Sequence, residues 1–184
     1  MTDPYQIIGK YYPKDSRAAE ILVIHSEAVA RKALIIAGYL NLNPEETDFI
    51  REASMLHDIG IILTNAPDIG CHGDFPYICH GYKGHDLLVE EGLPRHALVC
   101  ERHTGAGLTI KDIDNQNLPL PRRMMIPVSL PERIIAYSDK FFSKNPERLQ
   151  QERSFEDVLS SMRRFGPEKA AIVTEWHKEF YRSV

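Results

Sequence analysis

The chain has 184 residues, of which 43% are apolar and 26% charged, and a formal net charge of −4. This length and composition predict one globular domain over residues 1–184 and exclude a disordered or fibrous protein. The weakly acidic balance argues against a protein that coats nucleic acid or a membrane surface. Three cysteines without a CxxC pair, and no secretory signal, lead us to expect a cytoplasmic protein with free thiols.

The first half of the chain shows helical periodicity. Apolar residues over 16–40 recur at the spacing of an amphipathic helix. Asn43 followed by Pro44 is a start signal for a second helix, which we expect to end at about residue 58. The segment 64–79 is rich in Gly, Pro, Asp and Asn and lacks periodicity, so it predicts a long loop.

The second half continues the helical pattern. We expect helices over 81–91 and 94–103, and then a short helix capped by Thr109. Residues 118–131 contain four prolines and predict an extended connector, within which Ser129 caps the next helix. Two last helices are expected over 155–165 and 167–182. Since strand-like runs with hairpin signals are lacking, the predicted fold class is an all-α, single-domain helical bundle.

Polar residues interrupt the apolar faces of these helices or lie near their ends. A single inward histidine is more often a hydrogen-bonded core residue than a ligand, and an aspartate near a helix end is more often a cap. Six such residues together would be costly to bury without shared compensation, which a divalent cation supplies. The pattern therefore predicts a metal site formed by His25, His57, Asp58, His80, His103 and Asp139.

The remaining histidines carry weaker predictions. His72 in the expected loop is interpreted as exposed, and His85 either as solvated or as a contact to the metal ligands or the substrate. His96 and His177 lie among charged residues on expected outer faces and receive no role.

The order and spacing of the six residues, with the strings HDIG at 57–60 and AYSDK at 136–140, resemble the HD-domain superfamily of metal-dependent phosphohydrolases. Residues 80–109 are similar to the small stand-alone HDIG proteins of prokaryotes. The resemblance covers about residues 25–140. It implies a helical bundle of the HD-domain type, with a metal-binding core over about 16–145 and carboxy-terminal helices over 154–182 that pack on it.

The resemblance also implies a ligand set. The metal site common to the superfamily corresponds to His25, His57, Asp58 and Asp139 in this sequence.

His80 and His103 match the extra ligands of the dinuclear members, in which Asp58 would bridge two divalent ions. Asp58, His80 and His103 are accordingly the implied catalytic residues. The ions implied are iron, manganese, zinc, nickel or magnesium, and their combined charge would attract a phosphate and activate water.

The expected partner is a small phosphorylated molecule rather than a nucleic-acid polymer or a membrane, and a homodimer is compatible with the sequence. Lys83, His85, Arg102 and Lys140 are candidate contacts to this substrate. After the HD pair the sequence offers only apolar residues and glycine, so the HDxxED string of stringent-nucleotide hydrolases is missing. The string TGAGLT stands where cyclic-di-GMP phosphodiesterases have GYP.

Two other functions remain open at this point. Some members of the superfamily use the same six ligands to hold a mixed-valence di-iron centre that cleaves a C–P or C–C bond with O₂. Imidazole and carboxylate suit iron as well as zinc or manganese, so the ligands alone do not separate the two reactions. The third hypothesis is a binding or sensor protein that retains the bundle and the metal without turnover.

Overall fold

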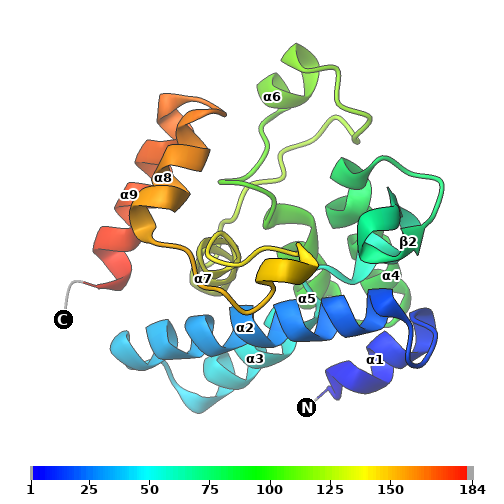
Figure 1. Ribbon diagram of the computed structural model, residues 1–184. Helices are drawn as coiled ribbons and strands as arrows, with labels where there is room; N and C mark the ends of the chain where they lie inside the picture. Colours follow the sequence, from blue (N-terminus) through cyan, green and yellow to red (C-terminus); the bar gives the residue numbers. More distant parts are fainter. Residues whose placement is uncertain (1, 182–184) are drawn as a thin grey trace.

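The computed structural model describes residues 2–181 (Figure 1). The expected all-α class is confirmed, and Arg182, at the expected end of the last helix, lies outside the described residues. None of the helices within that part of the chain is both long and apolar enough to cross a membrane. In chain order the α-helices are α1 (Pro4–Tyr11), α2 (Arg17–Tyr39), α3 (Pro44–Leu56), α4 (His80–Glu90), α5 (Pro94–Arg102), α6 (Ile110–Asn115), α7 (Leu130–Asp139), α8 (Phe155–Arg163) and α9 (Pro167–Phe180).

Side-chain caps start several of the helices at the expected positions. Ser16 accepts a hydrogen bond from the Ala19 amide at the start of α2. Asn43 and Ser129 cap α3 and α7 in the same way. Thr109 forms a reciprocal capping box at the start of α6. These side chains satisfy amides that the first turn of a helix leaves without a partner.

The structure differs from the expectation in two places. The opening segment forms α1, which Asp3 caps and which buries Ile8. The segment 64–79 is not a plain loop, because it contains short 3₁₀ helices and an antiparallel pair of two-residue strands. These elements are η2 (Pro67–Ile69), η3 (Tyr77–Cys79), β1 (Asn65–Ala66) and β2 (Cys71–His72).

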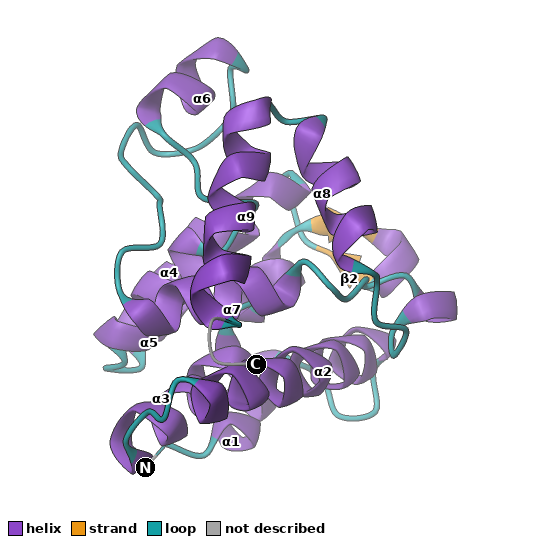
Figure 2. Ribbon diagram, turned by 90° about the vertical axis from the view of Figure 1, so that its left-hand side faces the viewer, coloured by secondary structure: helices purple, strands orange, loops and turns teal. Residues whose placement is uncertain are grey.

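Within residues 2–181, two apolar clusters form the core, and α2 contributes to both. One cluster joins α2, α3 and α7 to the carboxy-terminal helices α8 and α9. The other joins α1 and α2 to α4 and α5. Figure 1 shows α2 across the lower part of the view, with α7 near the centre and α8 and α9 to its upper left. Figure 2 shows the same arrangement from the side, with α2 and α3 below α8 and α9.

Two glycines allow η1 (Ile59–Leu63) to lie directly against α4. A Cβ atom on Gly60 would lie 2.1 Å from the carbonyl oxygen of His80. A Cβ atom on Gly84 would lie 2.9 Å from the backbone nitrogen of Gly60, and 2.3 Å from the Cys100 sulfur on α5. Only glycine permits so close an approach of two backbones. As a result Asp58, at the start of η1, lies beside His80, at the start of α4.

Candidate metal centre

The six residues predicted to bind metal lie together although they come from five segments of the chain. His25 is in the middle of α2, and Asp139 is the last residue of α7. His57 ends α3 and Asp58 precedes η1. The remaining two residues are His80 at the start of α4 and His103 at the end of α5.

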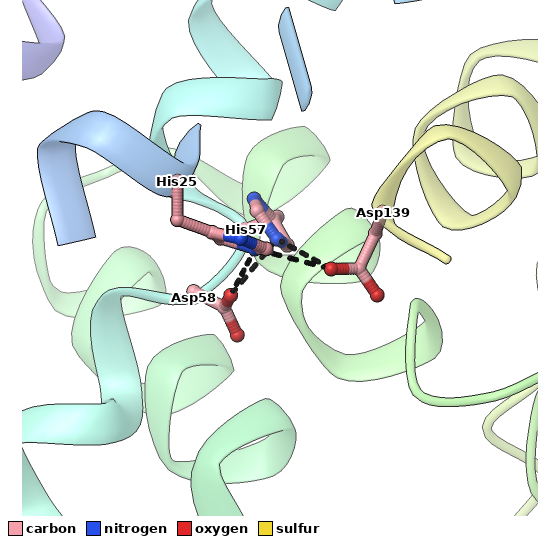
Figure 3. Close-up of side chains that lie close together, drawn as sticks. All are labelled: His25, His57, Asp58 and Asp139. Carbon is pink, nitrogen blue, oxygen red and sulfur yellow. Dashed lines mark hydrogen bonds and ion pairs between the residues drawn. The ribbon is translucent and has the colours of Figure 1, made fainter. Parts of the chain in front are cut away.

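One group of four surrounds a common point (Figure 3). The Nε2 atom of His25 lies 3.1 Å from Asp139 Oδ1 and 3.2 Å from Asp58 Oδ2. The Nε2 atom of His57 lies 3.0 Å from the same Asp58 oxygen. One potential ligand atom from each residue lies within 4.8 Å of the others. This spacing suits a single cation bound by two imidazoles and two carboxylates.

The other oxygen of Asp58 faces a second group. Asp58 Oδ1 lies 3.5 Å from His80 Nε2 and 3.4 Å from His103 Nε2. The two Nε2 atoms are 3.1 Å apart. Asp58 therefore presents one carboxylate oxygen to each of the two groups of histidines.

Backbone carbonyls fix the orientation of three of the imidazole rings. In each ring Nδ1 lies 2.7 Å from the carbonyl oxygen three residues earlier. A carbonyl only accepts hydrogen bonds, so Nδ1 carries the proton and the Nε2 lone pair points into the cluster. The pairs are His57 with Ser54, His80 with Tyr77, and His103 with Cys100.

Some of the polar atoms in the centre of the cluster are buried without a hydrogen-bond partner in the described part of the chain. Within residues 2–181, neither His57 Nε2 nor either Asp58 carboxylate oxygen has one, although neighbouring donor and acceptor atoms lie close. Lone pairs that face one another in a buried site are unfavourable unless a cation lies between them. Imidazole nitrogen and carboxylate oxygen are ligands for zinc, iron and manganese, so these residues fit divalent metal ions.

The electrostatics of the cluster follow from its burial. Burial lowers the pKa of His80 to about 3 and also lowers that of His103, which favours the neutral imidazole that binds metal. Burial opposes the charge on Asp58, but His57 and Lys144 outweigh it and hold the Asp58 pKa well below its ordinary value. Burial also opposes protonation of His57, but Asp58 and Asp139 together raise its pKa to about 9, so a metal ion that binds Nε2 of this ring would displace a proton.

Two lysines lie at the edge of the cluster. Lys140, an expected substrate contact, donates to Asp139 Oδ2 at 2.8 Å and to the carbonyl oxygen of His103 at 3.1 Å. Lys144 was not among the expected residues, yet its ammonium nitrogen lies 2.6 Å from Asp58 Oδ2. Burial opposes the charge of Lys144, but the nearby carboxylates raise its pKa above the ordinary lysine value. Lys144 thus offsets part of the negative charge of Asp58.

The other expected substrate contacts point to groups outside the cluster. The Lys83 ammonium lies 3.9 Å from the centre of the Phe75 ring. His85 Nδ1 lies 3.2 Å from the carboxylate of its neighbour Asp86. The side chains of Lys83 and His85 therefore contact groups other than the six clustered residues.

Arg102, the last of the expected substrate contacts, also lies apart from the cluster. It donates a hydrogen bond to Glu132 at 3.0 Å. The contact ties α5 to the start of α7.

The histidines given no role include two that were placed wrongly. His96 is buried rather than on an outer face, and its Nε2 atom lies 3.3 Å from Glu52. His177 is half-buried, stacks on Phe155 and shares a hydrogen bond with the Tyr137 hydroxyl. Charged neighbours in the sequence misled the prediction. His96 packs against Phe49 of α3, and His177 packs against Phe155 at the start of α8. The expected exposure of His72 is confirmed.

The amino-acid sequence is similar to those of several known proteins. An uncharacterised protein of Methanocaldococcus jannaschii is 35% identical over 124 residues, which are 66% of this chain and 66% of that protein. A tRNA (cytidine(56)-2′-O)-methyltransferase of Picrophilus torridus is 29% identical over 131 residues, 71% of this chain. The enzyme of the same name from Thermoplasma volcanium is 29% identical over 164 residues, 88% of this chain. The matched parts are only 34% and 42% of these two enzymes.

The family model that matches is the HD domain, over residues 22–143. That range contains all six clustered residues and the helices that position them. The chain belongs to the HD-domain family.

Proposed function

We propose that this chain is a metal-dependent phosphohydrolase that acts on a small phosphoester at the six-residue cluster. The observation that carries the proposal is the position of Asp58, whose two oxygens face two separate groups of histidines. Such a carboxylate between two sets of ligands is suited to a pair of divalent ions. Membership of the HD-domain family supports the same reaction class.

The residues divide between two ions. His25, His57 and Asp139 would hold one ion together with Asp58 Oδ2, and His80 and His103 would hold the other together with Asp58 Oδ1. When bound, two divalent ions supply positive charge for a phosphoryl group and lower the pKa of water toward ~7. The protein keeps the ligands in place through the carbonyls that orient the histidine rings.

The two lysines give the site a further attraction for phosphate. Lys140 and Lys144 line the same cavity as Asp139, with their ammonium groups against the two carboxylates. A phosphoryl oxygen that enters this cavity would accept hydrogen bonds from these ammonium groups, which are strong because donor and acceptor are both charged. The pair therefore orients the phosphoryl group toward the cluster.

The names of two relatives concern methyl transfer to tRNA, and we do not extend that activity to this chain. The match covers 34% and 42% of those enzymes, and the family that it identifies is the HD domain. The net charge of −4 supports a small substrate rather than a nucleic-acid polymer. All six clustered residues come from one chain, so the proposed activity does not require a homodimer.

The test is an assay of phosphate release from a panel of phosphomonoesters under nitrogen, with the protein loaded separately with manganese, iron, zinc, nickel or magnesium. We expect phosphate release that needs the metal, stops on addition of a chelator and proceeds without oxygen. Oxygen consumption with a phosphonate, together with no phosphate release under nitrogen, would replace the proposal by the di-iron oxygenase. Bound metal without turnover in either atmosphere would replace it by the binding protein.

A further inference from the structure

A cavity of about 380 Å³ lies beside the metal centre. Its lining includes Asp139 of the cluster and the two lysines, Lys140 and Lys144. Its volume falls within the range of small-molecule sites, about 300–1,000 Å³. If the phosphoryl group of a substrate reaches the six residues through this cavity, the organic part of the substrate would remain in the cavity.

Apolar side chains make up much of the rest of the lining. An apolar cavity with cations beside it matches a ligand that carries an anionic group on an apolar body. The apolar residues are Ile78, Leu108, Leu118, Phe142, Met162 and Phe165.

A second hollow also reaches Lys144 but is less suited to the substrate. Its volume is about 770 Å³, and its lining includes the charged residues Arg17, Asp68 and Glu147. In the part of the chain that the structure describes, its lining contains none of the six clustered residues. Of these two hollows in the described part of the chain, the cavity of about 380 Å³ is the one whose lining includes a residue of the cluster, Asp139.

The carboxy-terminal helices form one wall of the cavity. Met162 belongs to α8 and Phe165 follows it, so both lie outside residues 22–143, which match the family model. Lys169 of α9 is buried and donates to the carbonyl oxygen of Gly107 and to Asp112 Oδ2, each at 2.7 Å. These bonds fix α9 to the turn at 104–108 and to Asp112 of α6, and both the turn and Asp112 line the cavity. Figure 1 shows α6 and the turn between α8 and α9 at the same end of the molecule.

Phe165 presents an aromatic ring at this wall without burying it. Its exposed fraction is 67%, although most phenylalanines are well buried. Gly166, with a φ of 124°, reverses the chain directly after it, so Phe165 lies at the turn between α8 and α9. A second aromatic residue, Phe142, lines the same cavity. Two aromatic rings beside a cationic site are suited to a planar ring that carries a phosphate.

We propose, on the basis of the function proposed above, that this cavity binds the organic part of the substrate and selects a planar aromatic group. The substrate is then a phosphomonoester of an aryl alcohol or of a nucleoside rather than of a small polar alcohol. The metal centre and the lysines recognise the phosphate, while Phe165 and Phe142 recognise the ring. The part of the chain beyond the family match thus determines specificity.

The experiment measures the binding of phosphonates, which are not phosphate esters, to the metal-loaded protein by calorimetry under nitrogen. We expect phenylphosphonate to bind about tenfold or more tightly than methylphosphonate, because stacking on an aromatic ring adds to the shared phosphonate contacts. In Phe165→Ala the affinity for phenylphosphonate should fall about tenfold with that for methylphosphonate unchanged. Phe165→Trp should retain the preference, and Ile172→Ala, an exposed apolar residue of α9 outside the cavity lining, should leave it intact.

Equal affinity for the two phosphonates, including no binding of either, would overturn the proposal, as would a preference that survives in Phe165→Ala. The 5′-phosphonate analogue of AMP distinguishes the two sources of the ring: tighter binding than phenylphosphonate identifies a nucleoside, and weaker binding identifies a simpler aryl group. Phosphate release without any preference for the ring would contradict this inference and leave the proposed function intact. A Phe165-dependent preference without phosphate release would support this inference and contradict the proposed function.

Discussion

The Asp58→Asn variant is expected to lose more than about a hundredfold in affinity for divalent metal ions at both positions. The side chain that is replaced lies between the two groups and contributes one oxygen to each. Asparagine keeps the shape but removes the negative charge and one of the two oxygens. Mutation of a residue that only orients the metal ligands lowers metal affinity about 10- to 100-fold. Loss of a ligand shared by both positions should therefore lower the affinity further.

The measurement is a metal titration of the purified protein after removal of metal with a chelator. The matched control is Asp86→Asn, which makes the same change at an exposed aspartate of α4 that contacts His85. We expect the control to bind metal like the wild type. If Asp58→Asn bound metal as tightly as the control, Asp58 would not be a ligand.

The Lys144→Met variant is expected to change metal affinity and activity in opposite directions. The Lys144 ammonium lies 2.6 Å from an Asp58 oxygen, where it repels a cation bound by the same carboxylate. Its removal should raise the affinity for metal about tenfold, because juxtaposed like charges cost free energy. The same change removes a cation that would contact the phosphoryl group, so kcat/KM should fall about a hundredfold.

Lys83→Met is the control, since that ammonium contacts the Phe75 ring rather than the cluster. Metal titration and phosphatase assays of both variants separate the two effects. Weaker metal binding in Lys144→Met would show that the lysine supports the ligands instead of competing with a cation. An unchanged kcat/KM would show that it does not contact the substrate.

The helices and the clustering of the six residues were predictable from local patterns in the sequence. Caps such as Ser16 and Asn43 mark helix starts because only a few side chains satisfy the first amides. His25 was recognisable because it interrupts an apolar stripe of a long helix. The contacts that join His25 to Asp139 at 3.1 Å and His80 to Asp58 at 3.5 Å are long-range in sequence, and the resemblance to a family predicted this set of ligands.

Lys144 gave no signal in the sequence. It follows α7 in a segment without periodicity, and a lysine in such a segment is ordinarily a solvated surface charge. Its contact with Asp58 depends on how the chain turns back after α7. Its position five residues after Asp139 does not by itself predict a contact with the cluster.

Arg102 and Lys83, expected as substrate contacts, have side chains that contact groups outside the cluster. Arg102 directly precedes His103, but neighbours on a helix point about 100° apart, and its side chain reaches Glu132 instead. Lys83 lies three residues after His80, but its ammonium contacts Phe75. A residue that is close in sequence to a clustered residue therefore need not direct its side chain toward the cluster.

The number of metal ions bound per chain tests the central claim most directly. Metal analysis of the wild-type protein after loading and dialysis should give two ions per chain, because Asp58 serves two groups. The double variant His80→Ala, His103→Ala should retain one, since His25, His57 and Asp139 still surround the other Asp58 oxygen. One ion or none in the wild type, or two in the double variant, would contradict the two-ion site.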